Sequence, residues 1–179
     1  MENLLFDNTP TAHYGGYRQT VYFGLFEDTK TFPQVAALTA TTTNADAVTA
    51  VGTLTPVTGK KFGSIQAKVH RVGQEGDYAA EDNSAAKYLL KIFLQEGAEA
   101  EGFLYKFKGA YMWFAPQQSD GTFRLYGRDT GYPARIIGSK LVHPESPDDA
   151  KGPEIEVTIE FMPFAPAYWT GTISTAAGV

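Results

Sequence analysis

The feature that most constrains the fold is the strict alternation of residues 154–161, Glu-Ile-Glu-Val-Thr-Ile-Glu-Phe. Charged or polar side chains occupy every second position, and large apolar side chains occupy the positions between them. Because successive side chains of a β-strand point to opposite faces of its sheet, this pattern predicts a strand with one buried face. The other face is expected to meet water or a partner.

The composition extends this expectation to the whole chain. Its 179 residues include 18 Gly, 10 Pro, 10 Tyr and 12 Phe, and strands favour aromatic residues while turns favour Gly and Pro. The length suits a single domain over residues 1–179, with an ordered core over 18–170 and a flexible tail over 171–179. The predicted fold class is mainly β, an antiparallel β-sandwich or partly closed barrel with one packed α-helix.

Other segments show weaker strand patterns. The pair Asp120-Gly121 accepts positive φ, so it predicts a hairpin turn between the strands on either side of it. The further strands are expected at residues 19–26, 60–73, 103–107, 111–115 and 123–127, and within 132–142.

One helix is predicted over about Ser84–Glu96. Capping side chains precede it at Asp82-Asn83-Ser84, and Gly97 provides a stop. Apolar residues then recur at three- and four-residue spacing, which gives one apolar stripe that must pack on a sheet. The stripe consists of Ala85, Tyr88, Leu89, Ile92 and Phe93.

The segment Lys30–Gly59 is rich in Thr and Ala and poor in large side chains. It is too long for an ordinary connection within a compact domain. It is either a flexible loop or an extended arm that becomes ordered against a neighbouring subunit. The residues expected at such an inter-subunit contact are Thr39, Thr41, Thr43, Asp46 and Val48.

The sequence offers no constellation for catalysis, for a metal or for a cofactor, so an enzyme ranks last among the function classes. It has no cysteine, and its three histidines lack partners at metal-ligand spacing. The residues around Thr58–Lys61 depart from the spacing of a phosphate loop, and neither a nucleophile elbow nor a dinucleotide fingerprint occurs. A net charge of −5 argues against tight nucleic-acid binding. No apolar run is long enough to span a membrane.

Two groups of side chains admit both a structural and a functional interpretation. Glu154, Glu156 and Glu160 share one strand face, which is either a solvated surface or, in a ring, the lining of a channel. Aromatic residues around the Asp120-Gly121 turn either fill the core or form a stacking platform for a ligand. This aromatic group consists of Tyr111, Trp113, Phe123 and Tyr126.

The order of these parts resembles the tail tube and related major tail proteins of long-tailed phages. The segment Trp113–Gly127 is similar to the strand, Asp-Gly turn and strand of tail-tube-like proteins from phages of Bacteroides and its relatives. Glu156–Phe161 followed by Ala165–Trp169 is similar to their closing strand and proline-aromatic tail. The likeness covers residues 84–170 in local sequence and the N-terminal half only in layout.

The resemblance implies a structural subunit. Six copies would form a ring, and rings would stack into a tube in the virion, assembled in the host cytoplasm, with other tail proteins as further partners. The sheets of neighbouring copies would join into one continuous barrel, with Glu154, Glu156 and Glu160 as candidates for its lumen. DNA would pass through without specific binding, and no membrane would be involved.

Two alternatives remain open from the sequence. A neck or tail-completion ring protein of the same kind of particle would share the architecture. A monomeric small-ligand or carbohydrate-binding β domain would instead use the aromatic residues in a concave pocket.

Overall fold

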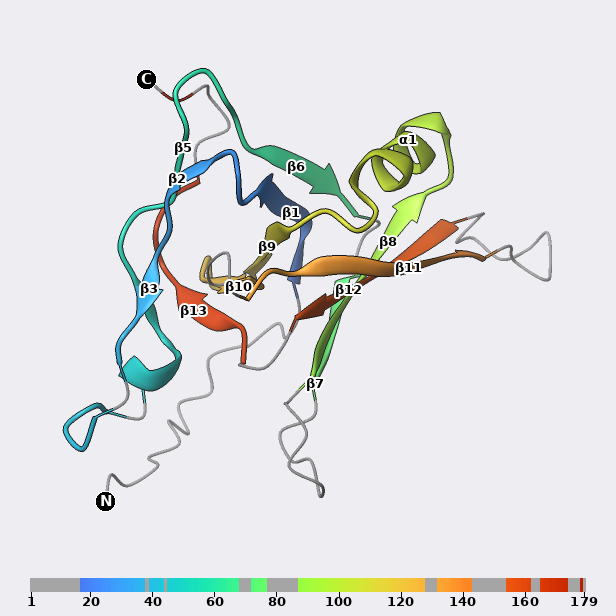
Figure 1. Cartoon of the computed structure of the whole chain (residues 1–179). Coiled ribbons are helices and arrows are strands. Elements are labelled where there is room, and N and C mark those ends of the chain that lie inside the picture. The colour runs from blue at the N-terminus through green and yellow to red at the C-terminus, as the bar shows by residue number, and fades with distance from the viewer. Residues whose placement is uncertain are drawn as a thin grey trace.

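The computed structural model describes residues 17–37, 39–43, 45–67, 72–76, 87–127, 132–142, 154–161, 165–173 and 178. Two antiparallel sheets face each other and one helix lies at their end, as the predicted β-sandwich requires (Figure 1). The two sheets do not close into a barrel in the described part of the chain.

Sheet 1 has five strands in the order β13-β10-β9-β1-β6. Its centre is the pair β1 and β9, which align Phe23 with Phe114. The turn between β9 and β10 is the predicted one, since Gly121 has φ 94° and the Thr122 amide donates to Asp120 Oδ1 at 2.8 Å. The bounds are β1 Tyr17–Leu25, β6 Gly63–Gln66, β9 Met112–Gln118, β10 Phe123–Leu125 and β13 Ala167–Trp169.

Sheet 2 has four strands in the order β11-β12-β8-β7, and every neighbouring pair is antiparallel. The alternating segment 154–161 forms β12 near its centre, with its apolar residues buried. The bounds are β7 Val72–Gly76, β8 Tyr88–Gln95, β11 Arg135–Val142 and β12 Glu154–Phe161.

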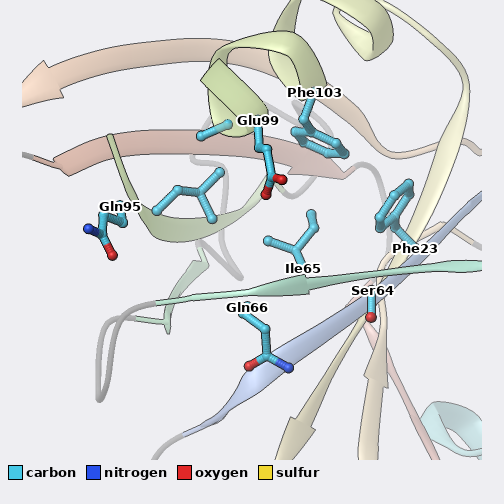
Figure 2. Close-up of a pocket in the computed structure, with 9 residues that line it drawn as sticks. Phe23, Ser64, Ile65, Gln66, Gln95, Glu99 and Phe103 are labelled. Carbon is cyan, nitrogen blue, oxygen red and sulfur yellow. The ribbon is translucent and has the colours of Figure 1, made fainter. Parts of the chain in front are cut away.

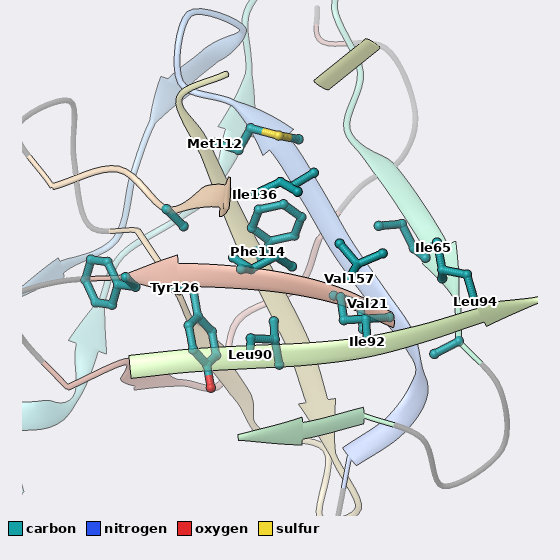
Figure 3. Close-up of a cluster of buried hydrophobic side chains, with 14 of the residues drawn as sticks. Val21, Ile65, Leu90, Ile92, Leu94, Met112, Phe114, Tyr126, Ile136 and Val157 are labelled. Carbon is teal, nitrogen blue, oxygen red and sulfur yellow. The ribbon is translucent and has the colours of Figure 1, made fainter. Parts of the chain in front are cut away.

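The two sheets enclose a core of apolar side chains, which we call the inner core (Figure 3). Sheet 1 contributes Val21 and Phe114, and sheet 2 contributes Leu90, Ile92 and Val157, all at most 1% exposed. At about 25 cal/mol per Å² of buried apolar area, such residues dominate the folding free energy. The alternation of β8 and β12 therefore fixes which face of sheet 2 turns inward.

The helix prediction over Ser84–Glu96 was wrong. Residues 77–86, including Ser84, lie outside the described residues, and Tyr88–Gln95 form strand β8. Tyr88, Leu90, Ile92 and Leu94 alternate into the inner core. Leu89 and Phe93 point to the other face, and their four-residue spacing mimicked a helical stripe. Strands β12 and β7 pair with both edges of β8, which satisfies its backbone hydrogen bonds.

The helix lies immediately after this strand, as α1 over Ala98–Phe107, where a strand was predicted for 103–107. Phe103 and Phe107 are four residues apart and contact Phe23, with ring centroids at 5.1 and 5.6 Å. Tyr105, which completed the apparent alternation, is 94% exposed. Glu99 and Glu101 lie in the first turn, which is the favourable end of the helix dipole for anions.

The predicted strand over 60–73 is two strands in different sheets. β6 lies at the edge of sheet 1 and β7 at the edge of sheet 2, with residues 68–71 between them outside the described residues. Within the predicted tail 171–179, the Gly178 amide donates to the Lys60 carbonyl oxygen at 2.8 Å.

The predicted arm, Lys30–Gly59, contains short strands where the sequence indicated a loop or an extended arm. Its base folds back on the outer face of sheet 1 as two small antiparallel pairs, β2 with β5 and β3 with β4. These strands span Thr29–Thr31, Gln34–Val35, Ala50–Val51 and Thr55–Pro56, and the short 3-10 helix η1 spans Asp46–Val48.

Two tryptophans of sheet 1 hold the arm in place. Trp113 Nε1 donates to Thr29 Oγ1 and Trp169 Nε1 donates to the Gly52 carbonyl oxygen, both at 3.0 Å. Phe62 stands edge-on to Trp113 with ring centroids 4.8 Å apart. These rings belong to a second apolar cluster, the outer core, between sheet 1 and the arm. Sequence inspection missed it because its partners are distant along the chain.

Candidate assembly surface

The candidate surface is the outer face of sheet 2, on the side opposite the inner core. On β12 the outward residues Glu156, Thr158 and Glu160 are half-buried, while their inward neighbours are buried. On β8 the outward residues Leu89, Lys91 and Phe93 are also half-buried. A sheet face without a covering layer is a site for solvent or for a partner.

Charge on this face changes sign from strand to strand. β11 carries Arg135 and Lys140, β12 carries the glutamates, β8 carries Lys91, and β7 carries Glu75. The register places Arg135 opposite Glu160 and Lys140 opposite Glu156. Cross-strand pairs of opposite charge stabilise a sheet, so the charges on each strand attract those on its neighbours.

Two ion pairs are formed on this surface. Lys87, just before β8, contacts Glu160 at 2.5 Å, and Lys91 Nζ contacts Glu75 Oε1 at 2.8 Å. The hydrogen bond to Glu75 raises the pKa of Lys91 above its ordinary value of 10.5. Both pairs are partly exposed, so their energetic contribution is small and sensitive to salt.

The predicted lumen-facing glutamates do share one face of β12. They differ in exposure, however, since Glu154 is 2% exposed whereas Glu156 and Glu160 are half-buried. They are also interleaved with the cations of β8 and β11. The face is therefore one of alternating charge and not of uniform negative charge.

Sheet 2 has a free strand at each edge within the described residues, β11 on one side and β7 on the other. On β11, Ile137 is 46% exposed and Leu141 is 48% exposed. Beside this edge the guanidinium of Arg135 lies over the Tyr111 ring, 4.4 Å from its centroid. A long free edge with exposed apolar side chains is a template for pairing with another chain.

The described residues of the arm tip, 36–37, 39–43 and 45–48, lie on the side of the molecule opposite α1 (Figure 1). Hydroxyl hydrogen bonds order it, with Thr43 Oγ1 donating to Asp46 Oδ2 at 2.7 Å and Thr39 Oγ1 3.1 Å from Thr41 Oγ1. All of the predicted contact residues lie on this tip, where Val48 is half-buried and the others are exposed.

The four aromatic residues predicted around the hairpin do not meet on one surface. Trp113 and Phe123 lie in the outer core, whereas Tyr126 lies in the inner core. Tyr111 is 54% exposed and stacks with Arg135. Because neighbouring residues of a strand point to opposite faces, these rings are divided between the two cores. Of the two interpretations, core packing is therefore the one that Trp113, Phe123 and Tyr126 follow.

A pocket of about 410 Å³ lies instead between β6, the end of β8 and α1 (Figure 2). Phe23, Ile65 and Phe103 line its apolar part, and Gln66 and Glu99 supply polar atoms. Sequence inspection missed it because the helix was assigned to the wrong segment. No metal-binding cluster of His, Cys, Asp or Glu occurs among the described residues, and His13, His70 and His143 lie outside them.

Glu75, Lys91 and Arg135 were not singled out from the sequence. The signal was present as a constant sign of charge on each strand, but Lys87 and Lys91 were assigned to a helix.

Within the described part of the chain, no helix has the length and apolar character needed to cross a membrane. Comparisons of the chain with protein-family models, with curated proteins and with solved structures find no significant match.

Proposed function

We propose that this chain is a structural subunit of a phage tail tube, in which copies form stacked, hexameric rings around a channel for DNA. The observation that carries the proposal is sheet 2, which has an uncovered face and two free edges in the described residues. The order of parts that resembles tail tube proteins supports the same function.

The topology of sheet 2 suits a ring. Its four strands alternate in direction, so β11 and β7 run in opposite directions. Rotational symmetry would place β7 of one copy beside β11 of the next, and the two strands would be antiparallel. The joined sheet would then continue without a break and would have no exposed edge.

The size of such a ring is consistent with a channel. Six copies of four strands give about 24 strands, and barrels of about 16 to 18 strands already enclose an aqueous channel. At about 4.8 Å between strands the backbone perimeter is roughly 115 Å before strand tilt is included. The outer face of sheet 2 would line this channel.

The charge on that face suits DNA passage. Binding to DNA gains most of its affinity when lysine and arginine release counterions from phosphates. Here the cations of β8 and β11 are opposed by the glutamates of β12 and β7. Such a lining would offer phosphates little net attraction. The arm tip, projecting on the opposite side from α1, would contact the next ring.

The test is the mass of the protein in solution, measured by size exclusion with light scattering at rising concentration, followed by negative-stain microscopy. Hexameric rings or tubes are expected. Ile137→Lys and Leu141→Lys place a charge at the β11 edge and are expected to abolish rings without unfolding the chain. Tyr105→Lys, on the exposed face of α1, is the matched control and is expected to assemble normally. A wild-type chain that remains monomeric when concentrated would refute the proposal.

A neck or tail-completion ring protein is the nearest alternative, since it would use the same edges. The same micrographs separate the two, because a tube protein stacks into tubes and a completion protein stops at single rings.

The pocket beside α1 favours a second candidate, a monomeric domain that binds a small ligand or carbohydrate. Its volume of about 410 Å³ and its two phenylalanines fit a small, partly apolar ligand. A thermal-shift screen of sugars and small apolar compounds tests it, with Phe103→Ala as the variant expected to lose any shift. Shifts that persist in Phe103→Ala would place the ligand elsewhere.

A further inference from the structure

We propose that the charges at the two edges of sheet 2 make copies of this chain join head to tail, β7 to β11, and prevent the joining of like edges. The inference rests on the proposed function, because it concerns how neighbouring sheets recognise each other in a ring. It adds a specific role for Glu75 on one edge and for Arg135 and Lys140 on the other.

Backbone geometry alone does not determine which edge strands of two copies pair; we call each such pairing a joint. A twofold axis would pair β11 with β11, or β7 with β7, and both joints would be antiparallel. Such isologous joints would give closed dimers, whereas the head-to-tail joint gives a ring. Something other than hydrogen bonding must therefore favour the ring.

The outward charges supply that selection. The described outward charge on β7 is the acidic Glu75, and those on β11 are the basic Arg135 and Lys140. A β7–β7 joint brings together two carboxylates, and a β11–β11 joint brings together four cations. Like charges opposite each other destabilise a sheet, so the like-edge joints are disfavoured.

The register supports a direct pairing in the head-to-tail joint. Glu75 lies opposite Leu89, Leu89 lies opposite Glu160, and Glu160 lies opposite Arg135. Glu75 and Arg135 are therefore the two ends of one row across the sheet, on the same face. A neighbour joined in line would bring its Arg135 beside Glu75, at about 4.5–5.5 Å between Cβ atoms.

The side chains of Glu75 and Arg135 are each positioned by a neighbouring residue of their own chain. Lys91 engages Oε1 of Glu75 while the glutamate side chain stays 63% exposed. Arg135 is exposed and its guanidinium lies over the Tyr111 ring. Side chains that are already ordered lose less conformational entropy when they bind.

The experiment changes the sign of one edge at a time and measures mass by light scattering. Glu75→Lys makes both edges basic and is expected to reduce the ring fraction at least tenfold. Arg135→Glu leaves β11 with one anion and one cation, which complement each other about a twofold axis, and it is expected to shift the mass from rings to dimers. Glu101→Lys on α1 makes the same charge change as Glu75→Lys and is expected to assemble like the wild type.

The triple variant Glu75→Lys, Arg135→Glu and Lys140→Glu exchanges the sign of the two edges and is expected to restore rings. Circular dichroism of each variant checks that the monomer is folded. Normal rings from Glu75→Lys, or no recovery in a folded triple variant, would overturn the inference while the tube function stands. A wild-type chain that forms no rings would overturn both.

Discussion

The two sheets share the inner core but differ in their other face. Sheet 1 is covered by the chain's own arm, which two tryptophans hold through hydrogen bonds and ring contacts. Sheet 2 is uncovered in the described residues and carries charges that alternate by strand. Sheet 1 is thus covered within one chain, whereas in the proposed ring the outer face of sheet 2 lines the channel and only its edges meet other copies.

Truncation of a large side chain is expected to give the largest difference in stability between the outer faces of sheet 1 and sheet 2. Trp113→Ala removes a fully buried ring and its hydrogen bond from the outer core, so we expect a loss of about 3–5 kcal/mol in the free energy of unfolding. Leu89→Ala on the bare face of sheet 2 should cost about 1 kcal/mol, because the side chain is already half-exposed. Urea denaturation of the two variants measures the difference, and equal losses would mean that sheet 2 is covered as sheet 1 is.

A pair of glycines gives a second contrast. A Cβ at Gly24 of β1 would lie 2.7 Å from Trp113 Cζ2, so Gly24→Ala is expected to cost about 1–3 kcal/mol. At Gly138 of β11 a Cβ meets nothing within 4 Å, so Gly138→Ala should be neutral or should stabilise by about 0.4–1 kcal/mol. Thermal unfolding of both variants tests this. A large loss at Gly138 would show that β11 is packed more closely than its open surroundings indicate.

The side-chain hydrogen bond between the two sheets is expected to contribute less to stability than either apolar core. Tyr17 Oη of β1 donates to Gln74 Oε1 of β7 at 2.5 Å, and Tyr17→Phe should cost about 1 kcal/mol. Burial raises the pKa of Tyr17 above its ordinary value of 10.0. The folded state therefore favours the neutral phenol, so this stability is complete below pH 10 and is lost as the pH rises through the folded pKa. Tyr17→Phe should lose less stability than the wild type between pH 9 and 11 in parallel urea titrations, and identical pH profiles would contradict this.

The smallest effect is expected for single ion pairs on the bare face. Lys87→Met removes the contact with Glu160 and should change the free energy of unfolding by about 0.2–1 kcal/mol at low salt, and by less at high salt. Urea titrations of the monomer at two salt concentrations measure it. A loss above 2 kcal/mol that salt does not reduce would show that the charges on sheet 2 stabilise the monomer itself.

The sequence predicted those parts of the fold that local patterns determine. Strand β12 and the Asp120-Gly121 turn were correct because alternation and positive φ are local properties. The helix was misplaced for two reasons. Leu89 and Phe93 give a strand a four-residue spacing, and the exposed Tyr105 gives α1 an apparent strand alternation with Phe103 and Phe107. The arm could not be placed, because its binding depends on Trp113 and Trp169, far away in sequence. The alternating charges of sheet 2 became visible only once the strand order was known.

The measurement that tests the central claim most directly is disulfide cross-linking between β7 and β11. The chain has no cysteine, so the double variant Val72→Cys and Ser139→Cys reports only on these edges. Both residues lie in the row of Ile92, three strand spacings apart. That is about 14 Å, too far for a bond within one copy. We expect oxidation to produce a ladder of covalent multimers up to the hexamer, while each single variant forms no covalent multimers. Dimers from the single variants, or no multimers from the double variant, would contradict the account.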